Sequence, residues 1–265
     1  MKIILITLLF INLSFSHPVL DIINNPYAVP YFLNLTAMDL LPSDPEKVKN
    51  YIRWYLDHLN YPDKYGLTGT IYDYYIMENS EVPLYTYDSV DAYSATFLFL
   101  IYLYTEKTND YQLVKENLQK LKDVAYVIAY LQDQDGLIKA LPNVNLKYLV
   151  DNIECVCGLR AFSLLLWKLK DPDWRYYFTI SHNVERSVMK NLILRNQVAW
   201  AKLDDKLFIA SNSVVYPDLY AKAVFYSFLG RTIPDEWVSR FDHFQRTVMH
   251  MVKNRCFSIR SSAYF

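Results

Sequence analysis

The stretch LYTYDSVDAYSATFLFLIYLY, residues 84–104, decides the fold that this sequence predicts. It opens with two carboxylates, Asp88 and Asp91, and then runs apolar on nearly every face for about four turns. A helix on a protein surface shows one apolar stripe, whereas a helix that is apolar all round is surrounded by neighbours. The stretch therefore predicts a central helix over residues 88–106 whose first turn carries acid.

The rest of the chain predicts helix pairs around this central helix. The inner helices open at Asn25, Asp88, Asp151 and Asp218, which are 63, 63 and 67 residues apart. A period that contains two helices is typical of repeat architectures. Four pairs, each with an inner and an outer helix, predict an all-α fold in which stacked hairpins form an α/α toroid. The other expected helices cover residues 31–41, 43–59, 109–131, 149–169, 171–194, 214–229 and 233–251, with short extended pieces in 197–210.

Composition narrows the classes of function. The 265 residues suffice for one large domain, and the formal net charge of -1 argues against nucleic acid or an anionic membrane as partner. Aromatic residues make up 16% of the chain, and 24 of them are Tyr. Tyr suits clefts that are apolar on one face and wet at the edge, as sugar-binding clefts are. An aromatic core explains the same composition equally well.

Residues 1–16 have the pattern of a secretory signal peptide. Lys2 supplies the positive end, residues 3–10 are apolar, and a small-x-small SFS sequence precedes His17. The apolar run is short for a membrane-spanning helix. We therefore expect an exported domain over residues 17–265, secreted or periplasmic, without a stable membrane anchor.

The cysteines and the DQDGL loop at residues 133–137 predict no metal or cofactor site. Cys155 and Cys157 lie two apart in an expected helix, so their side chains diverge, and no His spacing completes a zinc motif. Buried free thiols are expected, with a bridge to Cys256 as the alternative. The loop lacks the further acid of a calcium loop, which favours a turn. The sequon at Asn34 falls within an expected helix, which argues against glycosylation.

With these motifs, the chain resembles the six-hairpin glycosidases over residues 25–251. The resemblance rests on the helix-pair period, on DxxDAY at 88–93, on DxDGL at 133–137 and on DNxE at 151–154. It implies an (α/α)6 toroid that cleaves or remodels oligo- and polysaccharides in a funnel near the N-termini of the inner helices. A full toroid has six pairs and this chain supplies about four, so the resemblance implies a truncated or open member of the family.

Glycoside hydrolysis needs two carboxyl groups that flank the scissile bond. Aromatic neighbours can stack on sugar rings and can raise the pKa of an acid by desolvation. At Asp88 and Asp151, helix capping explains the same residues without any substrate. The candidate catalytic acids are Asp91 and Asp88 as the preferred pair, with Asp151, Glu154 and Asp73 as alternates. The candidate stacking residues are Tyr74, Tyr87, Tyr93 and Trp200.

A glycoside hydrolase that acts on a carbohydrate partner is the favoured function, and three alternatives stay open. A non-catalytic carbohydrate-binding relative fits the small number of helix pairs. A helical-repeat module that binds a protein would need no clustered acids. A polysaccharide lyase on the same architecture would use a Tyr or His base, and Tyr is abundant here. The sequence leaves the oligomeric state open.

Overall fold

The computed structural model describes residues 17–77, 80–195 and 197–256, so the expected signal peptide lies outside the described residues. The described chain is mainly helical, with short antiparallel strands. The helices are α1 (Pro30–Leu40), α2 (Pro45–Asp57), α3 (Val90–Thr108), α4 (Tyr111–Glu116), α5 (Leu118–Tyr130), α6 (Leu149–Lys168), α7 (Trp174–Asn191), η1 (Val215–Leu219), α8 (Tyr220–Phe228), α9 (Asp235–Val238), α10 (His243–Met251) and η2 (Val252–Cys256).

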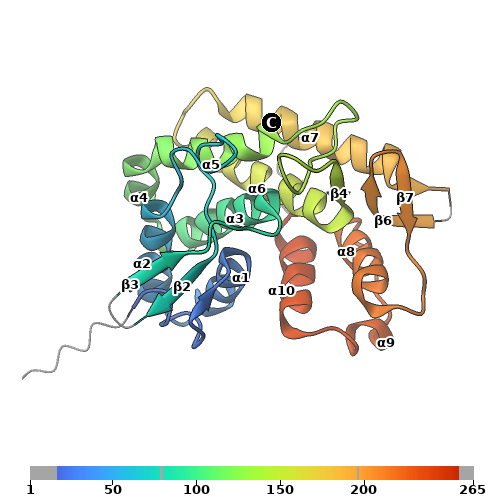
Figure 1. The fold of residues 1–265 in the computed structure, drawn as a ribbon, viewed down its shortest axis with the longest axis horizontal. Helices are drawn as coiled ribbons and strands as arrows, with labels where there is room; N and C mark the ends of the chain where they lie inside the picture. Colours follow the sequence, from blue (N-terminus) through green and yellow to red (C-terminus); the bar gives the residue numbers. More distant parts are fainter. Residues whose placement is uncertain (1–16, 78–79, 196, 257–265) are drawn as a thin grey trace, which may run out of the picture.

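The inner helices contact one another in a closed order. Helix α1 packs on α3, α3 on α6 and α6 on α8, while α10 contacts both α8 and α1. Phe32 and Phe244 join α1 to α10 with ring centroids 4.8 Å apart, and the hydroxyl of Thr247 donates to Asp39 Oδ2 at 2.8 Å. Helices α2, α5 and α7 lie outside this ring (Figure 1).

Helices α3 and α6 form the centre of the molecule. Nearly every residue of α3 from Val90 to Thr105 is buried, as its apolar sequence predicts. Gly158 of α6 lies so close to α3 that an added Cβ would come within 2.4 Å of the Ala95 carbonyl oxygen. The missing side chain therefore lets the two backbones approach closely.

Two expected single helices are each interrupted. The expected helix 109–131 divides at Asn117 into α4 and α5. The expected helix 233–251 divides into α9 and α10, because Asp242 starts a new helix with a capping box that includes Gln245. Helix α10 then joins the inner ring between α8 and α1, which the pairwise reading of the sequence does not predict.

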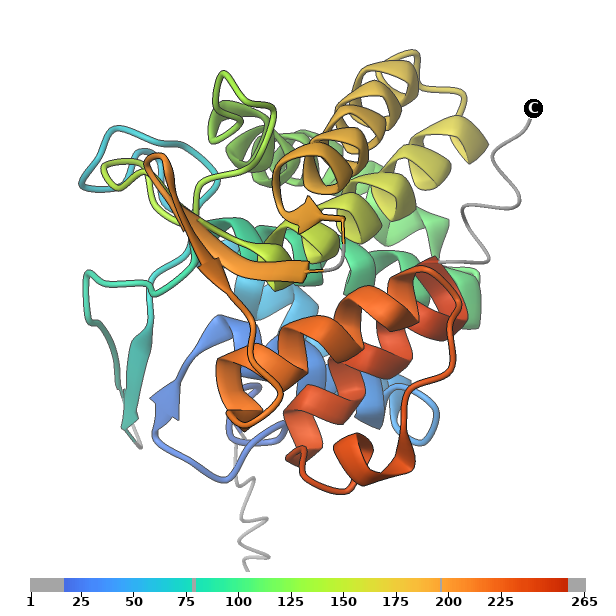
Figure 2. The ribbon, with the colours of Figure 1, turned by 90° about the vertical axis from the view of Figure 1, so that its right-hand side faces the viewer.

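The all-α prediction is incomplete, because the structure contains two small antiparallel sheets, and the extended pieces expected in 197–210 form strands of one of them. The expected loop 60–87 contains a hairpin that pairs with β1. In Figure 2 the hairpins and the N-terminal ends of α3 and α6 lie on the left-hand face, which is the front of Figure 1. The strands are β1 (Tyr27–Ala28), β2 (Tyr74–Met77) and β3 (Ser80–Pro83) in one sheet, and β4 (Leu146–Tyr148), β5 (Ile193–Leu194), β6 (Gln197–Leu203) and β7 (Lys206–Ile209) in the other.

The expectation of free thiols is wrong for two of the three cysteines, and the alternative, a bridge to Cys256, is the one that the structure contains. Cys157 and Cys256 form a disulfide across 99 residues, and Cys155 stays free and buried. The pairing arises because η2 packs against α6, a contact that no local pattern reveals. The sequon residue Asn34 is fully buried and hydrogen-bonded to Thr96 and Tyr51, so its amide is inaccessible to a glycosyltransferase in the folded chain.

None of the helices within residues 17–256, gaps excepted, is both long and apolar enough to cross a bilayer.

Candidate active site

Two of the predicted acids meet through one serine at the N-terminal ends of α3 and α6. Asp91 lies in the first turn of α3, and Asp151 lies in the first turn of α6. Ser89 Oγ hydrogen-bonds both carboxyl groups, to Asp91 Oδ1 at 3.0 Å and to Asp151 Oδ2 at a still shorter distance. A serine hydroxyl carries only one proton to donate. Both contacts are therefore satisfied together only when one of the carboxyl groups holds a proton.

Burial supports this shared proton. Asp91 has no exposed surface, and burial together with the nearby charge of Asp151 raises its pKa well above the usual value. Asp151 is partly exposed. Burial raises the pKa of Asp151 to about 6, with the hydrogen bond from Ser89 opposing the rise and the charge of Asp88 adding to it. Near neutral pH, Asp151 can therefore both hold and release a proton.

Glu154 lies one turn further along α6, behind Asp151. It is 1% exposed, and its Oε1 accepts a hydrogen bond of 2.7 Å from the hydroxyl of Tyr31. Its Oε2 has no hydrogen-bond partner among the described residues. Burial, and then the charge of Asp151, raise the pKa of Glu154 well above its usual value. The phenol of Tyr220 adjoins both Glu154 and Tyr31.

Asp73 forms a second acidic group on the same face. The hydroxyl of Tyr93 donates to Asp73 Oδ1 at 2.9 Å, and the backbone N–H of Asp88 donates to the Tyr93 oxygen at 3.4 Å. Burial raises the pKa of Asp73 to about 6, although the bond from Tyr93 opposes the rise. The exposed Asp88 also acts on Asp73 through its charge, as it does on Asp151. Asp88 therefore lies between the two groups.

The predicted stacking residues lie in different surroundings. Tyr93 is 2% exposed and links Asp73 to Asp88, so it offers no open ring face. Tyr74 is buried against Trp54, and Tyr87 is buried as a hydrogen-bond donor to a loop carboxylate. Only Trp200 is partly exposed on the acidic face, where its ring stacks on Tyr148 with centroids 6.2 Å apart.

Sequence reasoning missed five residues of this site. Tyr216 is 66% exposed, and the partial burial of its phenol raises its pKa, with smaller contributions from the charges of Asp151 and Asp88. A signal was available, since the openings of the inner helices at residues 25–32 and 215–223 are tyrosine-rich and equivalent to those that carry the acids. Treating the first residues of every inner helix as candidate site residues would have found most of the missed residues. The missed residues are Ser89, Tyr31, Tyr148, Tyr216 and Tyr220.

The capping explanation of the acids does not fit the helix ends. The N-cap residues of α3 and α6 are Ser89 and Tyr148, and neither helix has a side-chain cap hydrogen bond. By contrast, Asp44 and Asp110 cap α2 and α4 with their carboxylates. Asp88 and Asp151 therefore have no capping role that would account for them, although Asp91 accepts a hydrogen bond of 2.8 Å from the N–H of Ala92 in the first turn of α3.

The DQDGL loop is a lysine-paired turn. Lys147, which is 1% exposed, contacts Asp133 at 2.5 Å and Asp135 at 2.9 Å, and Lys202 contacts Asp135 at 2.7 Å. Gly136 has a φ of 81°, which suits the predicted turn. No group of three or more potential metal ligands occurs in the part of the chain that the structure describes.

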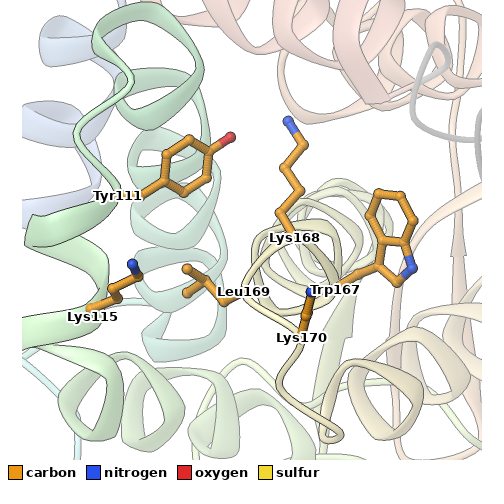
Figure 3. A pocket seen from close by; sticks show the side chains of 6 residues that line it. All are labelled: Tyr111, Lys115, Trp167, Lys168, Leu169 and Lys170. Atoms are coloured by element: carbon orange, nitrogen blue, oxygen red, sulfur yellow. The ribbon is translucent and has the colours of Figure 1, made fainter.

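A surface cavity of about 640 Å³ lies at the opposite end of α6 (Figure 3). Its lining includes the half-exposed Trp167 and Lys168, which is ion-paired with Glu106 at 2.5 Å. With a rise of about 1.5 Å per residue, α6 separates this cavity from Asp151 by roughly 25 Å. The cavity is thus distinct from the acidic site. It is lined by Tyr111, Lys115, Trp167, Lys168, Leu169 and Lys170.

Comparison with known proteins gives a likeness of fold. No family model and no curated protein matches the sequence. Solved structures do match, among them a possible member of the GH105 family from Salmonella enterica serovar Paratyphi A, with a TM-score of 0.52 and 14% identity. The match covers 91% of this chain and 58% of that one, so this chain spans less than two thirds of its neighbour. The two proteins share a helical fold.

Proposed function

We propose that this protein is an exported, glycoside hydrolase-like member of the α/α-toroid class that cleaves an oligo- or polysaccharide by carboxylate acid/base catalysis. The fold of a possible glycoside hydrolase supports the proposal, as does the closed order of the inner helices. The strongest support is Asp151, a partly exposed carboxyl group whose pKa lies at about 6. A general acid with such a pKa is protonated in enough molecules near neutral pH to protonate a leaving oxygen.

The remaining acids take roles that follow from their exposure. Asp88 is exposed beside Asp151 and is suited to activate a water or to stabilise positive charge on the sugar. Asp91 and Glu154 have almost no exposed surface, so they act as positioning residues behind Asp151. Asp73 is the alternate acid, with a pKa of about 6. We therefore propose Asp151, in place of Asp91, as the proton donor.

Aromatic rings near Asp151 provide sugar contacts in this proposal. Tyr216 exposes 66% of its surface, and Trp200 and Tyr148 form a stacked pair. Apolar ring faces with polar edges suit the faces and hydroxyl groups of a pyranose.

The proposal of export has independent support in the disulfide. Cystine bridges persist in oxidising compartments and are rare in the cytosol. The Cys157–Cys256 bridge is therefore consistent with a secreted or periplasmic protein, as the pattern of residues 1–16 suggests.

A glycan screen on the purified chain tests the proposed function. Reducing-end release and binding are measured together for the unaltered protein, for Asp151→Asn and for the control Asp57→Asn, which changes an acid with 70% side-chain exposure on α2. We expect release that disappears in Asp151→Asn and persists in the control. Equal release by all three proteins would contradict the role of Asp151.

A non-catalytic carbohydrate-binding protein is the second candidate. The observation that favours it is the burial of Asp91 and Glu154, because two of the five candidate acids cannot reach a substrate. Binding without release by the unaltered protein, across the whole panel, would favour this candidate over hydrolysis.

A further inference from the structure

Tyr85 bulges out of the chain opposite Asp73. The N–H of Leu84 donates to the carbonyl oxygen of Asp73 at 2.8 Å, and the N–H of Asp73 donates to the carbonyl oxygen of Thr86 at 2.8 Å. Leu84 and Thr86 thus bond the same residue, and Tyr85 between them is left out of the ladder. A bulge of this kind redirects a side chain and bends the strand.

The backbone of Tyr85 is held in an unfavourable conformation. Its φ is 56°, in the left-handed region that residues other than glycine seldom adopt. Lys64 Nζ donates to its carbonyl oxygen at 2.8 Å and so helps to hold the bulge. Strained residues persist only where their surroundings fix them, and they concentrate at functional sites.

The ring of Tyr85 is open to a ligand while its neighbours support it. Tyr85 is 62% exposed, and its ring lies 5.5 Å from that of the buried Tyr72. Tyr72 in turn stacks on Tyr87 at 5.8 Å and 15°, and Tyr87 adjoins the exposed Tyr65 at 6.1 Å. The buried rings of Tyr72 and Tyr87 therefore support the exposed ring of Tyr85.

This aromatic shelf, which consists of Tyr85, Tyr72 and Tyr87, adjoins the acidic site. Asp73, whose carboxyl group faces Tyr93 and the start of α3, is the residue to which both sides of the Tyr85 bulge are bonded. Asp88, three residues after Tyr85, acts on both Asp73 and Asp151. Tyr216 of η1 lies near Asp151, and Trp200 of β6 stacks on Tyr148 at the start of α6. A glycan chain that passes the acids thus has an aromatic surface available at Tyr85 as well.

We propose that Tyr85, supported by Tyr72, binds a further pyranose ring of the same glycan chain on the Asp73 side of the acids. The inference rests on the proposed carbohydrate function and deepens it, since it names an extended oligosaccharide as the ligand. A core role does not account for Tyr85, because most of its surface faces solvent. An ordinary turn does not require an aromatic ring at a left-handed position, where Gly or Asn serves better.

Chain-length preference tests this shelf. The probes are matched disaccharides and pentasaccharides of the xylo-, cello-, chito-, malto- and galacturono- series, read by turnover and by calorimetric binding. The variants are Tyr85→Gly, which removes the ring and relieves the strain, and Tyr85→Phe, which keeps the ring. Tyr130→Ala removes a similarly exposed ring (56%) from the outer helix α5 and serves as the control.

We expect Tyr85→Gly to lower kcat/KM for the pentasaccharide, or to raise its Kd, about tenfold. The values for the disaccharide should not change. Tyr85→Phe and Tyr130→Ala should keep the preference of the unaltered protein. If turnover is absent but pentasaccharides bind, the ratio of disaccharide Kd to pentasaccharide Kd tests the shelf by itself. Failure of hydrolysis is thereby distinguished from failure of the shelf. An unchanged ratio in Tyr85→Gly, or no binding by any oligosaccharide, would overturn the shelf.

Discussion

The motifs DSVD at residues 88–91 and DNIE at residues 151–154, which start α3 and α6, and the loop motif DQDGL at residues 133–137 carry two carboxylates each. The helix-start motifs and the loop motif lie in opposite electrostatic surroundings. In DQDGL, Lys147 lowers the pKa of Asp133 by hydrogen bonding. Burial alone would raise the pKa of Asp135, but hydrogen bonds from Lys202 and Lys147 hold it below its usual value. These carboxylates stay charged and fix a turn.

In the part of the chain that the structure describes, the helix-start motifs have no such basic partner. Among the described residues, no lysine or arginine forms an ion pair with Asp91, Asp151 or Glu154, and their pKa values are raised by burial and by one another's charges. Two acidic motifs that look alike in sequence thus differ in their basic partners. We infer that the unpaired motif is free to move protons and the paired motif is structural.

The largest expected effect separates the two motifs by activity. If a glycan substrate is found, Asp151→Asn should lower kcat by about 10²–10⁴-fold, because a general acid contributes on that order. Asp133→Asn should leave kcat within about twofold, since its carboxylate serves the turn. Turnover measured at one temperature well below unfolding checks both. A loss in Asp133→Asn equal to that in Asp151→Asn would remove the distinction.

The second expected effect concerns stability. Lys147→Met should lower the free energy of unfolding by about 2–3 kcal/mol, because it leaves two partly buried carboxylates without their shared lysine. Lys202→Met should cost about 1 kcal/mol, as it loses a single, more exposed pair. Urea unfolding measures both losses. If Lys147→Met proves as stable as the unaltered protein, the lysine is not what holds the turn.

The two motifs should also give opposite pH dependences of stability. Asp151 has a pKa raised from 3.8 to about 6, so its contribution is full below about pH 4 and is lost as pH rises through 6. After discounting for its partial exposure, this loss is about 1–2 kcal/mol. Asp133 has a lowered pKa, so its contribution is lost as pH falls through that lowered value.

Unfolding free energies between pH 3 and 8 check the sign of each contribution. In Asp151→Asn, the decline from pH 4 to 7 should become shallower. In Lys147→Met, the unfolding free energy should fall less than in the unaltered protein as pH is lowered toward 3. A steeper decline in Asp151→Asn would mean that the folded carboxyl group does not retain its proton.

The smallest expected effect comes from the bridging serine. Ser89 lowers the pKa of both Asp91 and Asp151, so Ser89→Ala should raise the pKa of Asp151 further. The pH–rate profile should shift to higher pH. Ser187→Ala, beside Gly136 in the lysine-paired turn, is the matched control and should shift nothing. A profile that does not move in Ser89→Ala would remove the serine from the acidic site.

The sequence predicts the two central helices and the placement of their acidic starts. The apolar stretch after Asp88 predicts α3, which begins at Val90, and the 63-residue spacing predicts that the start of α6 lies beside the start of α3. Ser89 contacts both Asp91 and Asp151, as expected if the starts of α3 and α6 lie side by side.

The remainder depends on tertiary contacts. Lys202 reaches Asp135 from 67 positions away, and Cys256 reaches Cys157 across 99, so no local pattern predicts either pairing. The exposure of Asp151 and the burial of Asp91 follow from how α3 packs on α6, and both residues occupy the first turn of their helix. Sequence therefore finds the acids but not which of them reaches solvent.

A carboxyl-carbon NMR titration of the folded protein tests the central claim most directly, because it measures each motif without a substrate. With the aspartate signals assigned through Asp151→Asn and Asp135→Asn, we predict that Asp151 titrates at about 6 and that Asp135 titrates below its usual value. Titration of both residues at the same ordinary value would contradict the account, since the two acidic motifs would then be electrostatically equivalent.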